Sequence, residues 1–415
     1  MKKITLKNGL NILYYPIDTA YSTVISLNIN AGIFLENSKN NGIIHFLEHI
    51  HFRRLNDVDQ NELYYKMNKI GSNLNGSTYK ELLKFYAKIR PRYFKEAISI
   101  FNKLLTADKW NEDDINYEKP IIMNEIREKE DYFDFDALIH SYIFEGTPYS
   151  MPILGSCETV SNITTEDLVQ YKRKIFSKEN VAIVITGKIT DSDIIECKSL
   201  FEKIQLSDFK HIHIKEKITK PSIKIFNEDF DYPCAVLSFP IDSSINNSEI
   251  TLLNSILGEG TGSLLDEIIR EKLGLSYNVY SYIELYKVGS FLNIYFSSDY
   301  NDIYECLSNI INILNKIKIN ISNKDMDTNV PYYTDNMWYL LENNEQLNST
   351  LSWEVFGEKH IKSIEERVLE FLQIDKQALV KLANKIFTKD KCTFIGAGKF
   401  KNFNIGKIEN IISRL

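Results

Sequence analysis

Residues 45–49 read HFLEH, with two histidines four positions apart and a glutamate just before the second. On an α-helix, which turns about 100° per residue, His45 and His49 lie one turn apart on one face, and Glu48 lies beside His45 on that face. The pattern is the inverse of the common H-E-x-x-H zinc helix. Since the chain has only seven histidines, the pentapeptide predicts a zinc site that activates water.

Length and composition describe a globular chain of more than one domain. A chain of 415 residues is too long for one ordinary core and suggests two to four domains. The net charge of −7 argues against a nucleic-acid or anionic-membrane partner. No apolar leader and no membrane-spanning run is visible, and the five cysteines form no C-x-x-C pair. We therefore expect a cytoplasmic protein with reduced thiols.

Two segments of the chain resemble each other without a gap. Residues 174–179 read KIFSKE and residues 385–390 read KIFTKD, an offset of 211 residues. A helical pattern precedes each segment, and an apolar strand followed by Gly-Lys comes after each. The offset, near half the chain length, predicts duplication of a unit of about 200 residues. The alternative is two unrelated helix–strand units with similar lysine-rich turns.

Strand and helix patterns are mixed along the first half. Residues 3–15 predict a hairpin around Asn-Gly, and the alternation at 25–29 predicts a half-buried strand. Residues 83–89 indicate another strand and residues 93–105 a helix. Because the elements do not alternate regularly as β-α-β, the fold class predicted is α+β.

The joint between the halves is predicted in a polar, lysine-rich stretch. We expect residues 1–205 to form an N-terminal zinc-binding half, 206–230 a linker, and 231–415 a C-terminal half. Strand-like patterns restart after residue 233, at Cys-Ala-Val-Leu-Ser-Phe-Pro.

Two histidines alone make an incomplete zinc site, because catalytic zinc usually has three protein ligands and one open position. Glu118 and Glu125 are seven residues apart and would share a helix face. From spacing alone, such a pair usually lines a solvated face. Pro120 lies between them, where it would kink a helix that does not start close by.

The chain resembles the pitrilysin/insulinase/mitochondrial-processing-peptidase family of zinc metallopeptidases, the inverzincins. Besides HFLEH, residues 73–78 (NLNGST) are similar to the family's "NAxT" strand that pairs with substrate. Residues 270–277 (REKLGLSY) are similar to its "RxxxGLxY" segment. The family has a glutamate ligand about 76 residues after the second histidine, a position that falls on Glu125.

The resemblance implies a role for each residue of the predicted site. His45, His49 and Glu125 would hold one Zn²⁺ per chain. Glu48 would not bind the metal but would take a proton from water and pass it to the leaving amine. Glu118 would orient a histidine or Glu125.

Three further residues are implied to contact substrate. Arg270 and Tyr277 would contact the substrate carbonyl or the oxyanion as it develops. Without the resemblance, they would be interpreted as an ordinary surface arginine and a packed tyrosine. Asn75 lies on the strand to which a peptide would add by main-chain hydrogen bonds.

The expected function is a zinc-dependent endopeptidase acting on peptides or unfolded segments. The resemblance implies two homologous α+β halves, and two such chains assembled as a clam-shell around a chamber. Since both the zinc motif and the Arg/Tyr segment occur here on one chain, we expect a homodimer. A heterodimer with a related subunit is the alternative. Two other functions stay open: a peptidase that removes leader segments from a small peptide product, and a catalytically inactive structural partner subunit.

Overall fold

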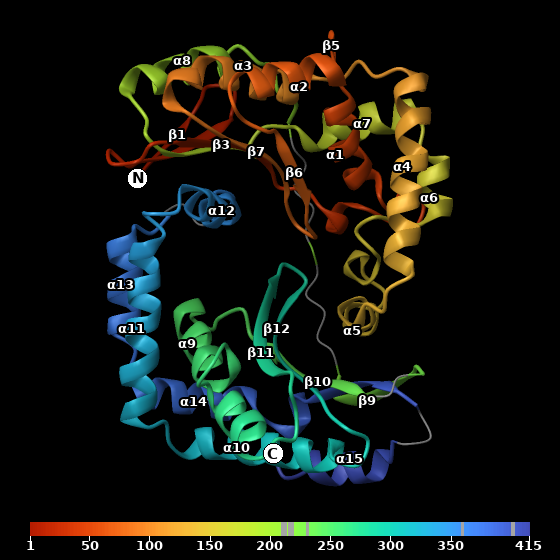
Figure 1. Ribbon diagram of the computed structural model, residues 1–415, viewed down its shortest axis with the longest axis vertical. Coiled ribbons are helices and arrows are strands. Elements are labelled where there is room, and N and C mark those ends of the chain that lie inside the picture. Colours follow the sequence, from red (N-terminus) through yellow and green to blue (C-terminus); the bar gives the residue numbers. More distant parts are fainter. Residues whose placement is uncertain (209–213, 215–219, 230–231, 358–360, 400–402) are drawn as a thin grey trace. The chain divides into compact units, whose positions relative to one another are not determined.

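The computed structural model describes the chain in two compact units (Figure 1). Unit 1 is Met1–His213 with Trp338–Ser363, and unit 2 is Ile214–Met337 with Ile364–Leu415. The residues described are 1–208, 214, 220–229, 232–357, 361–399 and 403–415.

Unit 1 is built on a six-stranded sheet with the order β1-β2-β8-β3-β7-β6. β2 and β8 are parallel, and the other neighbours are antiparallel. The strands are β1 (Lys2–Thr5), β2 (Asn11–Pro16), β3 (Thr23–Ile29), β6 (Asn75–Thr78), β7 (Leu83–Ile89) and β8 (Val181–Gly187). The predicted hairpin and the two predicted strands are confirmed in place, but β3, predicted to be half-buried, is buried on both faces because helix α12 (Asn344–Glu354) covers its polar side. β6 ends the sheet among the described strands.

Helices flank this sheet, with α2, α3 and α8 on one side and α12 on the opposite side (Figure 1). A short pair of strands, β4 (Arg54–Leu55) and β5 (Val58–Asp59), follows α1. The α-helices of unit 1 are α1 (Ile43–Arg53), α2 (Gln60–Lys69), α3 (Phe94–Thr106), α4 (Glu112–Glu130), α5 (Phe135–Ile143), α6 (Cys157–Asn162), α7 (Thr165–Ile175), α8 (Asp191–Phe201) and α12 (Asn344–Glu354).

Helix α12 belongs to unit 1 although it comes from the second half of the sequence. It packs on β3 and β8, and its buried residues include polar side chains as well as two leucines. The Asn348 amide donates to the carbonyl of Val184 at 3.1 Å, and the Ser352 hydroxyl lies 3.3 Å from that of Ser26. The boundaries of unit 2 therefore differ from the expected C-terminal half, 231–415, because α12, which hydrogen-bonds to the first sheet, groups with unit 1.

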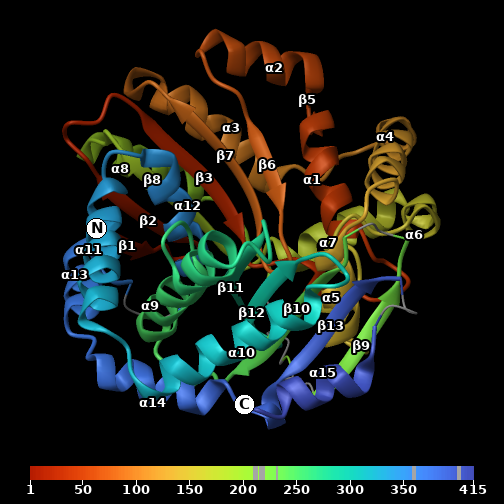
Figure 2. The same ribbon diagram turned by 60° about the horizontal axis from the view of Figure 1, so that its bottom comes forward.

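Unit 2 contains a five-stranded sheet with the order β11-β12-β10-β13-β9, and α10, α14 and α15 lie along one side of it (Figure 2). Its strands are β9 (Ser222–Asn227), β10 (Cys234–Ile241), β11 (Val279–Tyr286), β12 (Gly289–Ser297) and β13 (Thr393–Gly398). Its helices are α9 (Asn247–Gly258), a π-helical turn (Asp266–Lys272), α10 (Ile303–Ile319), α11 (Asn323–Tyr339), α13 (Ile364–Leu372), α14 (Lys376–Ile386) and α15 (Ile405–Ile412). The last two residues of α11 fall in unit 1.

The two sheets repeat one topology. The order β2-β8-β3-β7-β6 corresponds to β9-β13-β10-β12-β11, and in each sheet only the first pair is parallel. The two similar KIF segments end α7 before β8 and α14 before β13, which are equivalent places. The predicted α+β fold with two similar halves is confirmed.

Two other expectations concern the joint and the thiols. The predicted linker, 206–230, contains strand β9, and much of the rest of it lies outside the described residues. All five cysteines are described and unpaired, and four of them are buried. Among the described helices, none has the length and apolarity required to span a bilayer.

Candidate metal centre

Helix α1 carries the HFLEH residues and begins at a close backbone crossing. Gly42 precedes the helix with φ of 92°. A Cβ at Gly42 would lie 2.6 Å from the carbonyl oxygen of Leu154. Only glycine fits this position without strain. The apolar face of α1, with Ile44 and Leu47 fully buried, holds the helix in the core of the unit.

Glu36 fixes the first turn of α1, a role that sequence reasoning did not identify. Its carboxylate accepts N–H bonds from Gly42 at 2.9 Å and Ile44 at 3.0 Å, and a third bond from the Asn41 side chain. Burial raises the pKa of Glu36 and the three hydrogen bonds only partly offset this, so that its pKa is about 7. An acidic residue shortly before a Gly-led helix is the signal that could have indicated this anchor.

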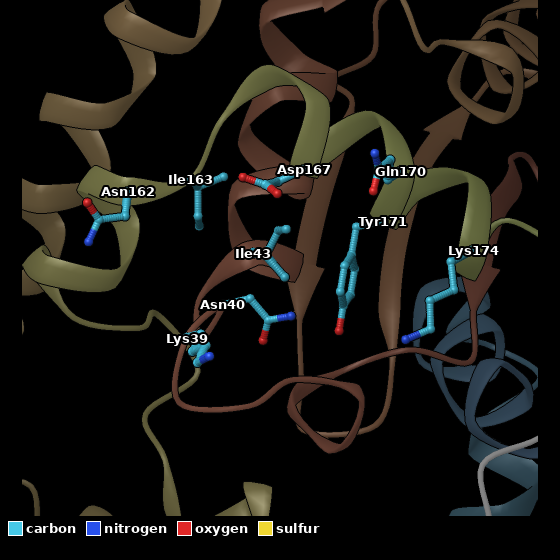
Figure 3. Close-up of a pocket in the computed structure, with 9 residues that line it drawn as sticks. All are labelled: Lys39, Asn40, Ile43, Asn162, Ile163, Asp167, Gln170, Tyr171 and Lys174. Carbon is cyan, nitrogen blue, oxygen red and sulfur yellow. The ribbon is translucent and has the colours of Figure 1, made fainter.

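A pocket of about 340 Å³ lies over the start of α1 and contains none of the predicted site residues (Figure 3). Tyr171 of α7 lines it, and its hydroxyl donates to the carbonyl of Leu35. The pocket therefore lies beside the segment that positions α1.

Helix α4 brings the two glutamates to α1. Its start is fixed by a capping box between Asn111 and Asp114, and Arg54 holds Asp114 with a 2.6 Å ion pair. The helix continues through Pro120, so the proline removes one hydrogen bond without ending the helix. Glu118 and Glu125 therefore lie on one face, two turns apart.

His45, His49 and Glu125 come together at one point. One ligand atom from each lies within 4.8 Å of the others, the one such cluster of three or more found among the described residues. Glu125 Oε2 is 3.7 Å from His45 Nε2 and 3.4 Å from His49 Nε2. A tetrahedral zinc with bonds of 2.0–2.2 Å separates its ligand atoms by about 3.3–3.6 Å. The residues present therefore fit a zinc ion.

The two histidines carry opposite electrostatic tendencies in the metal-free protein. Burial, together with the charge on His49, lowers the pKa of His45 to about 4. Burial also opposes charge on His49, but its hydrogen bonds to the carboxylates of Glu118 and Glu125 outweigh burial and raise the pKa of His49 to about 9. The imidazole of His49 is therefore the group that must lose a proton before it can bind a metal.

Glu48 is half-buried beside this cluster and is tied to the edge strand β6. The Thr78 hydroxyl donates to Glu48 Oε2 at 2.5 Å. A Cβ on Gly76 would lie 2.7 Å from Glu48 Oε1, so the strand and the carboxylate are in close contact. Burial raises the pKa of Glu48, while the bond from Thr78 and the charge on His49 lower it.

Glu118 and His51 occupy different environments near the cluster. Glu118 is buried, and its Oε2 lies 3.5 Å from His49 Nδ1, on the ring edge away from Glu125. His51, as expected, is not part of the cluster: it is fully buried and packs against Phe85 and Phe176.

The remaining predicted residues are distributed between the units. Asn75 is exposed at the start of β6, in unit 1. Arg270 and Tyr277 belong to unit 2, where the guanidinium carbon of Arg270 lies 5.2 Å from the centroid of the Tyr277 ring. Asp266 holds Arg270 at 3.1 Å, and Tyr277 is 80% exposed.

Comparison with known proteins identifies the family. Residues 14–156 match the family model "Insulinase (Peptidase family M16)", and residues 162–330 match "Peptidase M16 inactive domain". The chain is 26% identical to an uncharacterized zinc protease of Bacillus subtilis, covering 94% of this chain and 96% of that one. It is 30% identical to a probable mitochondrial-processing peptidase subunit beta of Arabidopsis thaliana, over 48% of this chain and 38% of that one.

The fold is also that of a solved structure, a protease from Helicobacter pylori. The TM-score is 0.85 at 18% identity, and the match covers 95% of this chain and 98% of the other. Together with the two family models, which cover most of the sequence in consecutive segments, these similarities show that the chain belongs to the insulinase, or M16, family of zinc proteases.

Proposed function

We propose that this protein is a zinc-dependent endopeptidase that hydrolyses peptides or unfolded segments. The observation that carries the proposal is the convergence of His45, His49 and Glu125 with ligand-like spacings, next to the carboxylate of Glu48, which is not part of the cluster. One Zn²⁺ per chain is expected, since the described residues contain one such cluster.

The chemistry is divided among these residues. His45, His49 and Glu125 hold zinc, which when bound lowers the pKa of a water molecule and polarises the scissile carbonyl. Glu48 takes a proton from the attacking water on its carboxylate and gives it to the leaving amine. Burial raises the pKa of Glu48 above the usual carboxyl value, which strengthens it as a base.

Two neighbours keep the reacting groups in place. Thr78 fixes one oxygen of Glu48 by a hydrogen bond, which directs the other oxygen to the water. Glu118 accepts the Nδ1 proton of His49 and so presents Nε2 towards the metal position. Both groups act through another residue and are therefore positioning residues.

The substrate is expected to bind as an added strand. β6 is the end strand of the sheet among described residues, and it carries Asn75 and the residues that contact Glu48. A peptide hydrogen-bonded to this edge would be held in register with the carboxylate. Arg270 and Tyr277 would contact the carbonyl or the developing oxyanion.

The test is to separate chemistry from metal binding. Glu48→Gln should abolish cleavage of a mixed peptide library while bound zinc, measured by elemental analysis, stays near one per chain. Glu128→Gln, an exposed change on α4, is the matched control and should cleave as wild type. Cleavage by Glu48→Gln at the wild-type rate would overturn the assignment. Absence of cleavage by the wild type would favour an inactive structural subunit.

A second candidate is a processing peptidase that removes leader segments. The similarity to the mitochondrial-processing peptidase beta subunit favours it. Mass-spectrometric mapping of cuts in a mixed library, with and without a chelator, distinguishes the two. Cuts at one position near the N-termini of a few peptides would indicate processing, and cuts dispersed along many peptides would indicate general turnover.

We also propose that two copies of this chain assemble as a clam-shell homodimer with two complete sites. The zinc cluster and the Arg/Tyr segment occur on one chain, so a single gene product contains all the predicted site residues. Light scattering on the purified protein should give twice the 48.3 kDa chain mass. An active monomer contradicts this assembly, and activity that requires a related second subunit supports a heterodimer instead.

A further inference from the structure

Lys84 of β7 is a buried cation with no ionic partner in contact with it. Lys84 is 5% exposed. Among the described residues its amino group makes one close interaction, 5.0 Å from the centroid of the Tyr86 ring. The nearest influential carboxylate, Glu345, is paired with Lys88 at 3.8 Å and affects Lys84 only through its charge. Burying an ammonium group without a counter-ion lowers the stability of the fold, so a lysine at this position indicates a functional role.

The face on which Lys84 lies follows from its neighbours in the strand. Phe85 packs against His51 and Phe52, which are on the α1 side of the sheet. Because side chains alternate along a strand, Lys84 and Tyr86 lie on the opposite side. This is the side on which α12 contacts β3, through Ser26 and Ser352 (Figure 1).

The cross-strand neighbours of Lys84 form a polar row that ends at the free edge. Lys84 pairs with Asn28 on β3 and with Ser77 on β6. Asn28 is fully buried, and its Oδ1 has no hydrogen-bond partner. Ser77 is small and half-buried, and it alone separates Lys84 from the edge of the sheet. A polar group entering past Ser77 would meet an unpaired cation and then an unpaired amide oxygen.

An added peptide strand would place a side chain within reach of this row. The residue opposite Ser77 would lie about two strand spacings, or about 10 Å, from the Lys84 backbone. A lysine and a glutamate side chain extended towards each other across Ser77 can span that distance. Gly76 and Thr78, on either side of Ser77, contact Glu48. The position opposite Ser77 is therefore within about two residues of the bond that is cleaved.

We propose that Lys84 is a specificity-determining residue that binds an acidic side chain of the peptide substrate at the position facing Ser77. The inference rests on the proposed peptidase function and adds a substrate class to it. Burial lowers the pKa of Lys84 to about 8, so most of the amine keeps its charge at pH 7. The carboxylate of an incoming Asp or Glu would complete the ion pair that the protein itself leaves open.

The test compares peptide pairs that differ by Glu or Gln at one position, taken in turn within two residues of the cut. Wild type should cleave one Glu peptide about tenfold faster in kcat/KM than its Gln partner, a typical effect of one charge-assisted bond. Lys84→Met should lose this preference, and Lys84→Glu should invert it for a Lys peptide. Lys88→Met, on the same strand and face, is the matched control and should keep it. Zinc content and thermal unfolding verify that the variants fold.

Binding provides an independent arm that does not need turnover. The same peptides, labelled and titrated onto Glu48→Gln protein, should show the Glu preference in Kd, and the Glu48→Gln/Lys84→Met double variant should not. Equal Kd values for the Glu and Gln peptides on the Glu48→Gln protein, or a Glu preference that survives in the double variant, would overturn the inference. Neither result would contradict the proposed peptidase function. A preference that appears only after Glu345→Gln would show that Glu345 neutralises Lys84, which also overturns it. Acid-selective binding without any cleavage would instead remove the proposed function.

Discussion

The two units have the same sheet topology, but the described metal cluster lies in unit 1 only. Their helices that follow the central strand differ in composition: α1 carries two histidines and a glutamate, whereas the buried residues of α9 include no histidine and no carboxylate. Each helix packs against the edge strand of its sheet, β6 or β11. The scaffold is therefore shared, and the chemistry depends on a few side chains.

The long helices α4 and α11 show the difference most directly. Each has a proline as its ninth residue, Pro120 and Pro331, and these are 211 residues apart, the same offset as the two KIF segments. The helix start and the proline therefore align α4 with α11 residue by residue.

At the aligned positions, amides replace carboxylates. Glu118 corresponds to Asn329, and Glu125 corresponds to Asn336. Glu118 contacts His49 of α1, and Asn329 in the same way contacts Ser255 of α9, at 2.6 Å. The packing between the two helices is thus kept in unit 2, while the charges that suit a divalent cation are absent.

The largest expected effect comes from replacing Glu125, the proposed third ligand, with asparagine, the residue found at the aligned position 336 of unit 2. Glu125→Asn should reduce bound zinc far below one per chain, because a neutral amide is a poor zinc ligand, and should lower kcat/KM on the order of 1,000-fold. Elemental analysis and peptide cleavage measure the two effects. Glu128→Asn on the same helix is the control for helix propensity. Full zinc and activity in Glu125→Asn would show that the comparison misidentifies the ligand.

Unit 2 is expected to contribute residues that contact the substrate rather than residues that bind the metal. Tyr277→Phe removes a hydroxyl on an 80% exposed ring and should lower kcat about 100-fold, as loss of one oxyanion donor does, with zinc unchanged. Tyr280→Phe, on the nearby strand β11, is the control. Unchanged kinetics in Tyr277→Phe would assign the ring to packing.

A smaller effect is expected from Glu118, which contacts the Nδ1 atom of His49, the ring nitrogen that does not face Glu125. Glu118→Asn should weaken zinc binding about 10–100-fold, the usual cost of losing the group that orients a ligand. Competition with a chromophoric chelator measures the affinity. If Glu118→Asn binds zinc as tightly as Glu128→Asn does, the contact at 3.5 Å has no orienting role.

Zinc affinity should also depend on pH through His49. Its pKa in the metal-free protein is raised to about 9, so below that pH zinc must displace a proton from this ring. His45, with a pKa of about 4, is already neutral. The affinity should therefore rise about tenfold between pH 7 and pH 8 and level off above pH 9. Equal affinities at pH 7 and pH 8 would mean that His49 is neutral before the metal binds.

Much of the fold was predictable because it depends on local patterns. The Asn-Gly hairpin, the apolar alternation of β7 and the helix α3 each have a periodicity that the sequence displays directly. The HFLEH pentapeptide needs only helical geometry to place its three polar groups together. The offset of 211 residues indicated the repeated topology because both copies kept the same helix–strand junction.

Other features depend on contacts that no local pattern records. Helix α12 contacts β3 and β8 through Asn348 and Ser352, polar residues that an amphipathic interpretation assigns to solvent. Glu36 lies six residues before Gly42, the first residue whose N–H donates to its carboxylate. In the sequence, Lys84 resembles an ordinary exposed residue of an alternating strand, although it is buried. Their roles follow from which strand or helix lies beside them. Pro120 also shows that a proline can lie within a long helix held by a capping box and by packing.

The smallest expected effect compares the two helix–edge-strand contacts themselves. A Cβ on Gly258 of α9 would lie 2.6 Å from the backbone nitrogen of Ser281, which cannot move without its strand. A Cβ on Gly76 of β6 would meet side-chain atoms of Glu48 and Phe52, at 2.7–2.8 Å, which shift more easily than the backbone of a strand. Gly258→Ala should therefore lower the free energy of unfolding by about 1–3 kcal/mol, and Gly76→Ala by less than about 1 kcal/mol.

Denaturant unfolding of both variants at saturating zinc measures this difference. Zinc content should stay unchanged in Gly258→Ala, because α9 and β11 contain none of the proposed ligands. The reverse order of stabilities would mean that the β6–α1 contact is the more rigid of the two. In that case Glu48 would be fixed by packing as well as by the Thr78 hydrogen bond. The two units would then resemble each other in how tightly the helix packs on the edge strand, and not only in sheet topology.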